Sequence, residues 1–406
     1  MITANKQFLD PKKVFIPLTD KTSKIANVKV AEGDTVLVGQ KLADKFNGKV
    51  KTPVISTISG EVIGFEERLD RFGKLVDHVV IENNFKGQSI ELEKLEGDLS
   101  PAQIRNRLEE CGINQINVDG IYTDIDFNRP VKHILVNAIY ANEPFLSTEY
   151  EYLKKSAEEI AEGVVLLAKA THAESMTLIV DKFMDEETLD NLGKATVDKG
   201  IEIVVINSKK VVGWDYKIAR KIAKEPLSID LLDNEIMYIA ACGAKLAYGA
   251  VREGQFVTKR QIAITGDAFG ENALYEVRIG TAFSEIAEDL GGYNETTNLN
   301  LHVGSFLTGQ QLENDSFSIT ASVDTVNVGV LRTEEEDVCI KCGECNDVCP
   351  AGILPQNIMD AELRNVNTRI VELNTSECVE CGLCTYVCPS KINVLEWVRR
   401  AKRRVG

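Results

Sequence analysis

Histidine is scarce in this sequence, and the four residues (His78, His133, His172 and His302) follow no metal-binding spacing. No apolar run approaches the roughly 18 to 20 residues that a membrane-spanning helix needs. The N-terminal stretch MITANKQFLDPKK lacks the apolar core and the small-residue cleavage site of a signal peptide. These absences predict a cytoplasmic protein. Any membrane association is expected to be peripheral, at the inner face of the cell membrane and through other subunits.

Positive charge is also in short supply. The 46 Lys and Arg residues are outnumbered by 62 Asp and Glu residues, which gives a formal net charge of −16. A general nucleic-acid-binding protein needs a basic face, so nucleic acid is not an expected partner. With 406 residues the chain is too long for one ordinary core. Roughly three or four units of about 100 residues are expected.

The cysteines are unevenly placed, because eight of the ten lie between Cys339 and Cys388. Disulfide frameworks belong to small secreted proteins, so metal ligation is the better interpretation of this cluster. Cys111 and Cys242 stand alone, and each is predicted to be a small buried core residue.

The eight clustered cysteines form two copies of the pattern C-x2-C-x2-C-x3-C-P, one beginning at Cys339 and the other at Cys378. This pattern is typical of two-cluster ferredoxins, in which three close cysteines bind one 4Fe-4S cubane and the fourth reaches the other. We therefore assign a first set of ligands, Cys339, Cys342, Cys345 and Cys388, and a second set, Cys378, Cys381, Cys384 and Cys349. The alternative is structural zinc in two four-thiolate sites, although zinc ribbons need neither the third close cysteine nor the Cys-Pro step.

The expected fold class is multidomain, α/β and β. Residues 1–90 are rich in strands and turns, and their V-x-V-A-E-G-D-x-V-x-x-G-Q pattern resembles the barrel-sandwich hybrid fold of lipoyl and biotinyl domains. The hairpin FNGKVKTP lacks the attachment sequence of those domains, so Lys49 and Lys51 are predicted to be unmodified.

Residues 100–255 alternate between apolar strands and amphipathic helices, including one helix predicted over 149–170. This alternation indicates a parallel α/β domain of the flavin-binding type, with both faces of its sheet covered. Residues 256–328 return to short strands around one helix, which suggests a β-grasp (SLBB-like) module. Residues 329–406 form a helix-rich two-cluster ferredoxin domain, whose C-terminal helix carries basic residues that suit a helix C-terminus or a docking surface.

The order of these pieces resembles the C subunit of the Rnf electron-transport complex over essentially the whole chain. The stretches CIKCGECNDVCPAGILPQ and CVECGLCTYVCPSKINVLEWVRRAK carry the resemblance most specifically, supported by VAEGDTVLVGQKL and RIGTAFSEIAEDLGG. The family is related to the flavoprotein subunit of respiratory complex I, which passes electrons from NADH through FMN to iron-sulfur clusters. It includes a soluble electron-transfer protein associated with D-proline reductase. The resemblance implies a redox donor and a redox acceptor as partners, such as a reductase or an Rnf-type complex.

The sequence departs from that family where FMN and NADH bind. The glycine-rich loop has become CGINQINVDGIYTDIDFNRP, in which only Gly112 and Gly120 remain. Ala141 and Asn142 replace the Glu and Cys of the acidic segment, before the matching Glu-Pro at 143–144. The family's T-G-x-E-x-P stretch is not recognisable near SKKVVGWDYK. Because backbone amides must approach the phosphate and the flavin ring closely, these departures predict that the nucleotide site is lost.

The preferred hypothesis is an electron relay with two 4Fe-4S clusters and no proton chemistry of its own. One alternative is an NADH:acceptor oxidoreductase subunit that binds FMN through a diverged loop. A second alternative is a scaffold protein in which the metal only stabilises the C-terminal domain.

Overall fold

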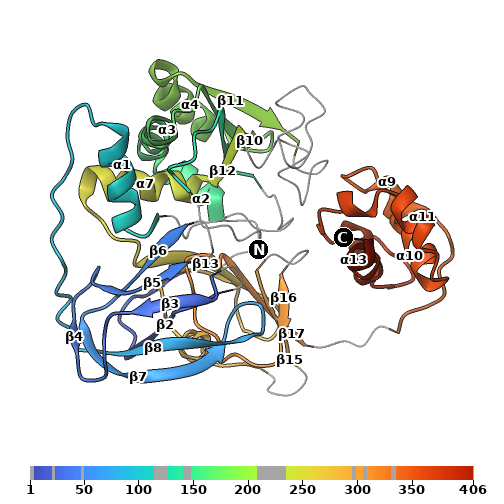
Figure 1. Ribbon diagram of the computed structural model, residues 1–406, viewed down its shortest axis with the longest axis horizontal. Coiled ribbons are helices and arrows are strands. Elements are labelled where there is room, and N and C mark those ends of the chain that lie inside the picture. The colour runs from blue at the N-terminus through green and yellow to red at the C-terminus, as the bar shows by residue number, and fades with distance from the viewer. Residues whose placement is uncertain are drawn as a thin grey trace.

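A computed structural model describes residues 4–20, 23–46, 50–113, 126–139, 148–207, 235–294, 299–304, 309–330 and 335–405 of the chain. Figure 1 shows three units packed together and a fourth, helical unit beside them that carries the C-terminus. Among the described residues, no helix has both the length and the apolar character needed to cross a bilayer.

The first unit is built from two small antiparallel sheets. One contains, in spatial order, β2 (Lys13–Pro17), β8 (Leu75–Asn83), β7 (Gly60–Leu69) and β4 (Thr35–Val36), and the other contains β3 (Ile25–Val28), β5 (Lys41–Phe46) and β6 (Lys51–Ile55). Val14, Leu42, Val62 and Ile81 are fully buried in the core of this unit. The pairing of β7 with β8 shifts by one residue between Val62 and Gly64, which bends the long hairpin around this core.

Lys51, one of the two lysines considered for lipoyl-type modification, opens β6 and forms an ion pair with Asp44, with 3.2 Å between Nζ and Oδ2. Lys29 and Lys41 also contact this buried carboxylate. Burial alone would raise the pKa of Asp44, but the three ammonium groups outweigh it and lower the pKa to about 2. Lys51 is thus engaged with a buried carboxylate, whereas Lys49 lies outside the described residues.

The N-terminal strand β1 (Ala4–Phe8) precedes the first unit in the sequence but is not part of its sheets. It pairs in parallel with β14 (Ala273–Arg278), with Ala4 opposite Ala273. The first unit also contacts this later segment directly. The backbone N–H of Phe15 donates to the carbonyl of Gly280 over 2.8 Å. Gly280 has φ +94°, and a Cβ at that position would lie 2.5 Å from Cδ1 of Ile16. The positive φ and the crowding by the Ile16 side chain both favour glycine at this contact between the two units.

His78 is a buried titratable group at the same junction. Its side chain is fully buried on β8, with Nδ1 2.8 Å from the carbonyl of Val76 and Nε2 3.4 Å from Oγ of Ser318. Burial lowers the pKa of His78 from 6.5 to about 4, against the opposing effect of the Val76 carbonyl. The unfolded chain therefore takes up a proton at a pH where the folded chain does not.

We expect His78 to make the protein sensitive to acid. Above about pH 6.5 the neutral, buried His78 costs the folded protein no stability. As the pH falls from there toward 4, the free energy of unfolding should decrease by about 1.4 kcal/mol per pH unit. Urea unfolding at pH 7 and pH 5 measures this loss. The His78→Gln variant should show less of it, and a variant of the exposed His172, His172→Gln, should retain it. Equal acid sensitivity in both variants would contradict the assignment.

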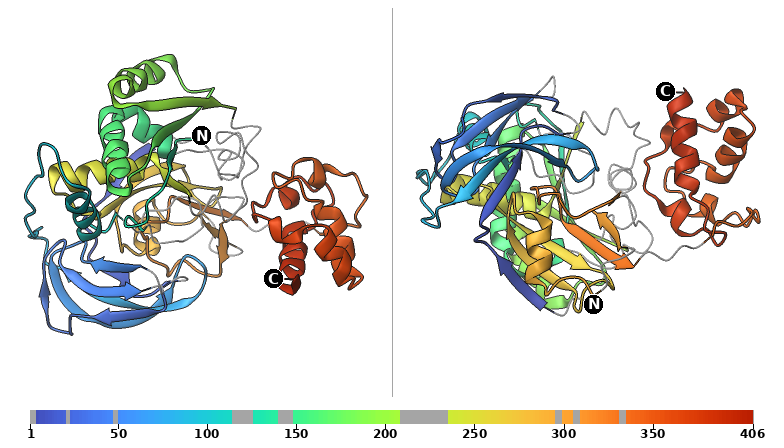
Figure 2. Two further views of the ribbon diagram at one scale, coloured as in Figure 1. Left: turned by 45° about the horizontal axis from the view of Figure 1, so that its top comes forward. Right: turned by 90° about the horizontal axis from the view of Figure 1, so that it is seen from below.

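The second unit has a four-stranded parallel sheet with spatial order β11 (Ile201–Ile206), β10 (Ser175–Asp181), β9 (His133–Asn137) and β12 (Ile236–Ala240). Its helices are α1 (Pro101–Glu110), α2 (Thr148–Lys155), α3 (Ala157–Thr171), α4 (Glu186–Thr196) and α7 (Ala241–Glu253), and the 3-10 turn η2 spans Val197–Lys199. In Figures 1 and 2, α1, α3, α4 and α7 lie together on one side of β10 and β11. Capping fixes two of these helices, through Ser100 with Gln103 before α1 and through Asp185 before α4.

The helix predicted over 149–170 is divided into α2 and α3. Ser156 separates them with φ −142° and ψ 37°, outside the helical region. Serine favours helix starts, and two acidic residues follow in the first turn of α3, Glu158 and Glu159. Local propensity at this position therefore competes with the long amphipathic pattern and ends the first helix.

The third unit is a six-stranded mixed sheet that packs against one helix, α8 (Phe283–Asp289). Its spatial order is β1, β14, β13 (Lys259–Thr265), β17 (Thr325–Val330), β15 (Leu299–Val303) and β16 (Gln310–Leu312). Phe283 of α8 stacks on Phe317, with ring centroids 5.1 Å apart. One helix on a small sheet agrees with the predicted pattern, and the specific β-grasp assignment stays a prediction.

Candidate iron-sulfur centre

The C-terminal unit is an internal repeat in structure as well as in sequence. Its helices are α9 (Glu344–Asp347), α10 (Pro355–Leu363), α11 (Asn367–Glu372), η4 (Thr375–Glu377), α12 (Leu383–Tyr386) and α13 (Val394–Val405). Helices α12 and α13 begin at the same steps after Cys378 as α9 and α10 do after Cys339. A side-chain contact also repeats, because Asn346 caps the N–H of Gln356 as Thr385 caps that of Leu395.

The backbone of the two cysteine runs takes unusual conformations at matching positions. Gly343 and Gly382 precede α9 and α12 with φ values of +85° and +79°. Lys341 and Glu380, two positions earlier, also have positive φ, at +58° and +56°. Positive φ is rare for residues other than glycine, and its appearance at the same step of both runs indicates a loop shape that both sites require.

The structure brings each predicted set of four cysteines around its own cavity. A cavity with about 350 Å³ of empty space, part of it open to solvent, is lined by Cys339, Cys342, Cys345 and Cys388, together with Ile340, Gly343, Met359 and Ile392. A second cavity, with about 320 Å³ of empty space that is also partly open to solvent, is lined by Cys378, Cys381, Cys384 and Cys349, together with Ile353, Gly382, Leu395 and Val398. In each case the fourth cysteine comes from the other run. The grouping therefore follows the predicted exchange of fourth ligands, and the ligand role itself stays a prediction.

The donor chemistry of both cavities fits an iron-sulfur cluster. Each offers four thiols and a mainly apolar lining, with Lys341 beside the first set and Glu380 beside the second, and thiolates are the usual ligands of 4Fe-4S clusters. Within the part of the chain that the structure describes, no three His, Cys, Asp or Glu side chains are grouped as ligands of a single metal ion. Within the described residues, the thiols of each set are thus not gathered at the distances that one metal ion requires.

The two sets differ in burial. Cys378, Cys381 and Cys384 of the second set are each 8 % exposed, whereas Cys342 of the first set is exposed. Burial raises the pKa of the Cys381 thiol to about 11, and the nearby thiols Cys378 and Cys349 add to the shift. Burial also raises the pKa of the Cys378 and Cys384 thiols. Without metal, Cys378, Cys381 and Cys384 are therefore protonated at pH 7, and metal binding must displace their protons.

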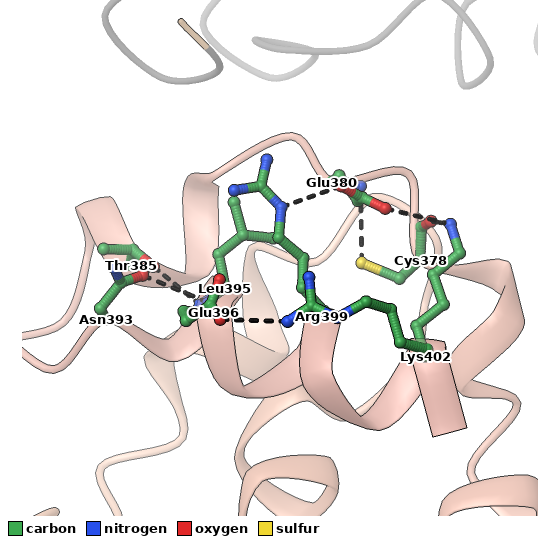
Figure 3. Close-up of polar contacts among 9 residues, drawn as sticks. Cys378, Glu380, Thr385, Asn393, Leu395, Glu396, Arg399 and Lys402 are labelled. Atoms are coloured by element: carbon green, nitrogen blue, oxygen red, sulfur yellow. Dashed lines mark hydrogen bonds and ion pairs between the residues drawn. The ribbon is translucent and has the colours of Figure 1, made fainter. Parts of the chain in front are cut away.

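A charged network connects the second set to α13 (Figure 3). Glu380 forms ion pairs with Arg399 over 2.9 Å and with Lys402 over 3.4 Å, while its backbone N–H donates to Sγ of Cys378 over 3.4 Å. Burial would raise the pKa of Glu380, but the two cations outweigh it and lower the pKa. Lys402 Nζ also donates to the carbonyl of Cys378 over 2.7 Å.

The other basic residues of α13 also contact carboxylates of the same unit. Arg400 and Arg403 pair with Glu396 over 3.1 Å and 3.2 Å, and Arg404 pairs with Glu362 over 3.1 Å. The basic character of α13 is thus partly balanced within the unit. The sequence indicated the basic helix but not the acidic partner of Arg399 and Lys402, because Glu380 lies in a cysteine loop well before the helix begins.

The remaining candidate positions are distributed as follows. Cys111 is fully buried, and burial raises the pKa of its thiol to about 12. Cys242 is also buried, and Arg260 NH1 donates to its Sγ over 2.8 Å. Both agree with the predicted core positions. Gly112 has φ +79° after α1. Gly120, positions 141–144 and the stretch SKKVVGWDYK lie outside the described residues, so the predicted loss of the nucleotide site stays a prediction.

Two family models match the chain: the RnfC barrel sandwich hybrid domain over residues 3–86, and the 4Fe-4S dicluster domain over residues 338–392. These matches confirm the barrel-sandwich hybrid fold predicted for the first unit and a 4Fe-4S ferredoxin fold for the last, while the number of clusters stays a prediction. A solved NAD+-reducing NiFe hydrogenase matches with a TM-score of 0.48 and 12 % identity, covering 76 % of this chain and 63 % of that chain.

Similarity to named proteins covers most of the chain. The C subunit of the Na(+)-translocating ferredoxin:NAD(+) oxidoreductase complex of Acetobacterium woodii is 28 % identical, with 97 % of this chain and 91 % of that protein covered. The C subunit of an ion-translocating oxidoreductase complex of Methanosarcina acetivorans is 26 % identical, with 86 % and 82 % covered. The corresponding C subunit of Haemophilus influenzae is 24 % identical over 85 % of this chain, which spans only 54 % of that relative.

Proposed function

We propose that the chain, an RnfC-like protein, transfers single electrons through two 4Fe-4S clusters, one held by each set of cysteines. The observation that carries this proposal is the pair of cavities, each lined by three cysteines of one run and the fourth of the other. A shared ligand pattern of this kind requires the two clusters to be neighbours. Their cysteine thiolates would be the ligands, and burial and amide hydrogen bonds would tune their reduction potentials.

The partners that this proposal implies are one redox protein that donates electrons and another that accepts them. The similar C subunits belong to ion-translocating oxidoreductase complexes, which supports an Rnf-type complex as the setting. A soluble reductase is the other setting that the sequence resemblance implies. We further propose that the protein is cytoplasmic, and that any contact with the membrane runs through other subunits of such a complex.

The α/β unit supplies no electron entry point in this proposal. Its glycine-rich loop and its acidic segment depart from the RnfC pattern at Ala141 and Asn142 and at most of the loop glycines. Without close backbone approach, the flavin phosphate and the nicotinamide nucleotide lose the amide donors that hold them. We therefore expect the chain to receive electrons already delivered singly by a partner.

The test is anaerobic purification of the full chain, with flavin, iron and sulfide quantified and a spectrum recorded before and after NADH is added. We expect about eight irons per chain, no flavin and no response to NADH, but bleaching of the cluster absorbance by dithionite. One bound FMN with rapid bleaching by NADH would instead establish the NADH:acceptor oxidoreductase alternative. Metal that undergoes no one-electron reduction would establish the scaffold alternative.

A further inference from the structure

Lys402 makes a contact that ties a positive charge to one of the two cysteine sites. Its ammonium group donates to the carbonyl of Cys378 over 2.7 Å and lies 3.4 Å from the carboxylate of Glu380. Figure 3 shows this side chain reaching from α13 to the loop that carries Cys378 and Glu380. Arg399, one turn earlier on α13, holds Glu380 from the other direction over 2.9 Å.

The internal repeat provides a comparison within one molecule. When Cys378 is aligned with Cys339, the positions that match Glu380, Arg399 and Lys402 are Lys341, Asp360 and Leu363. The second site therefore combines two cations with one carboxylate, whereas the matching positions of the first site combine one cation, one carboxylate and one leucine. The three positions at the second site therefore carry one more positive charge than the three matching positions at the first site. Lys402, which stands where the first repeat has Leu363, accounts for that difference.

A positive charge close to a redox centre stabilises its reduced form, because reduction adds negative charge. The second set of cysteines is the more buried one, and burial by itself disfavours that added charge. The side chains of Lys402 and Glu380 are themselves 34 % and 39 % exposed, so solvent screens part of the ammonium charge, while the cysteines beside it are buried.

We propose that Lys402 raises the reduction potential at the second set of cysteines, offsetting the burial of that set so that the site accepts an electron from the first. This inference rests on the proposed two-cluster function. In this proposal Lys402 adjusts the reduction potential of the second site. It acts through its positive charge beside the loop that carries Cys378 and Glu380, and it is not itself a ligand. No bond forms or breaks in this step, since one electron leaves one site and enters the other.

The test is an anaerobic redox titration of the full chain followed by electron paramagnetic resonance. We expect Lys402→Gln, which retains a hydrogen-bond donor but removes the charge, to lower one of the two midpoint potentials. The ratio of reduced to oxidised centre at a fixed potential should fall about tenfold, equivalent to about 59 mV for a one-electron couple. Lys402→Arg, which retains the charge, should behave like the natural protein.

A matched control is Arg400→Gln, which removes one positive charge from the same helix at a residue whose Nε lies 3.1 Å from Glu396. Both midpoints should stay in place in that variant. The reciprocal variant, Leu363→Lys, should raise the other midpoint.

Two reducible clusters with both midpoints unchanged in Lys402→Gln would overturn this inference and leave the proposed relay intact. The inference would also be overturned if Lys402→Arg lowered the midpoint potential as much as Lys402→Gln does. The potential would then depend on the specific contact of Lys402 with the Cys378 loop and not on its charge. Absence of reducible clusters in the natural protein would overturn both.

Discussion

Replacing both Cys339 and Cys388 with alanine is expected to leave about four irons per chain, whereas replacing both Cys384 and Cys388 is expected to leave none. The first pair lines one cavity although its members belong to different runs, so the pair of substitutions should disable one cluster only. The second pair belongs to one run but lines two different cavities, so each substitution should disable a different cluster.

Iron and sulfide analysis of the two anaerobically purified double variants measures this directly. The variant Cys111→Ala is a control, because it removes a buried thiol outside both cavities and should retain both clusters. If the Cys384 and Cys388 double variant kept a full cluster while the Cys339 and Cys388 variant lost both, each run would form its own site. The exchange of fourth ligands would then be wrong.

The second large effect is expected at Gly163, in the middle of α3. A Cβ at this position would lie 1.8 Å from the backbone carbonyl oxygen of Ala244 in α7. A change of side-chain rotamer cannot relieve this clash, because the atom that the Cβ meets belongs to the backbone of α7. Gly163→Ala should therefore force α3 and α7 apart and destabilise the α/β unit by roughly 3 kcal/mol, the upper end of ordinary overpacking costs.

Gly193 in α4 provides the matched control, since a Cβ there would have no atom within 4 Å. Gly193→Ala should stabilise its helix by about 0.5 to 1 kcal/mol, because alanine loses less conformational freedom in a helix than glycine does. Hydrogen exchange of the β9 and β10 amides in both variants reports on this unit separately. Equal protection in the two variants would show that the contact of α3 with α7 is looser than the structure indicates.

The chemistry-bearing part of the fold could be predicted from the sequence because its signal is local and repeated. Each run has four cysteines at fixed steps and a glycine at the matching position, Gly343 or Gly382. These residues specify the shape of the ligand loop within a short stretch of sequence. The barrel-sandwich unit was predictable for a similar reason, since its turns recur at short spacing. The boundaries of the four units remain predictions.

Long-range features could not be predicted in the same way. Strand β1 pairs with β14, far along the chain, and nothing in the sequence ANKQF distinguishes that partner from a nearer strand. The division between α2 and α3 rests on the backbone angles of a single serine, Ser156, within a continuous amphipathic pattern. The ion pairs of Glu380 depend on how α13 lies against a cysteine loop, which tertiary packing determines rather than local propensity.

The most direct test of the two-cluster proposal is a native mass spectrum of the anaerobically purified full chain. We predict a mass increase over the polypeptide equal to two 4Fe-4S clusters, with a species of one cluster appearing when ligation is partly lost. An increase equal to two zinc ions, or to one cluster with no two-cluster species, would contradict the proposal that each cysteine set holds its own iron-sulfur cluster.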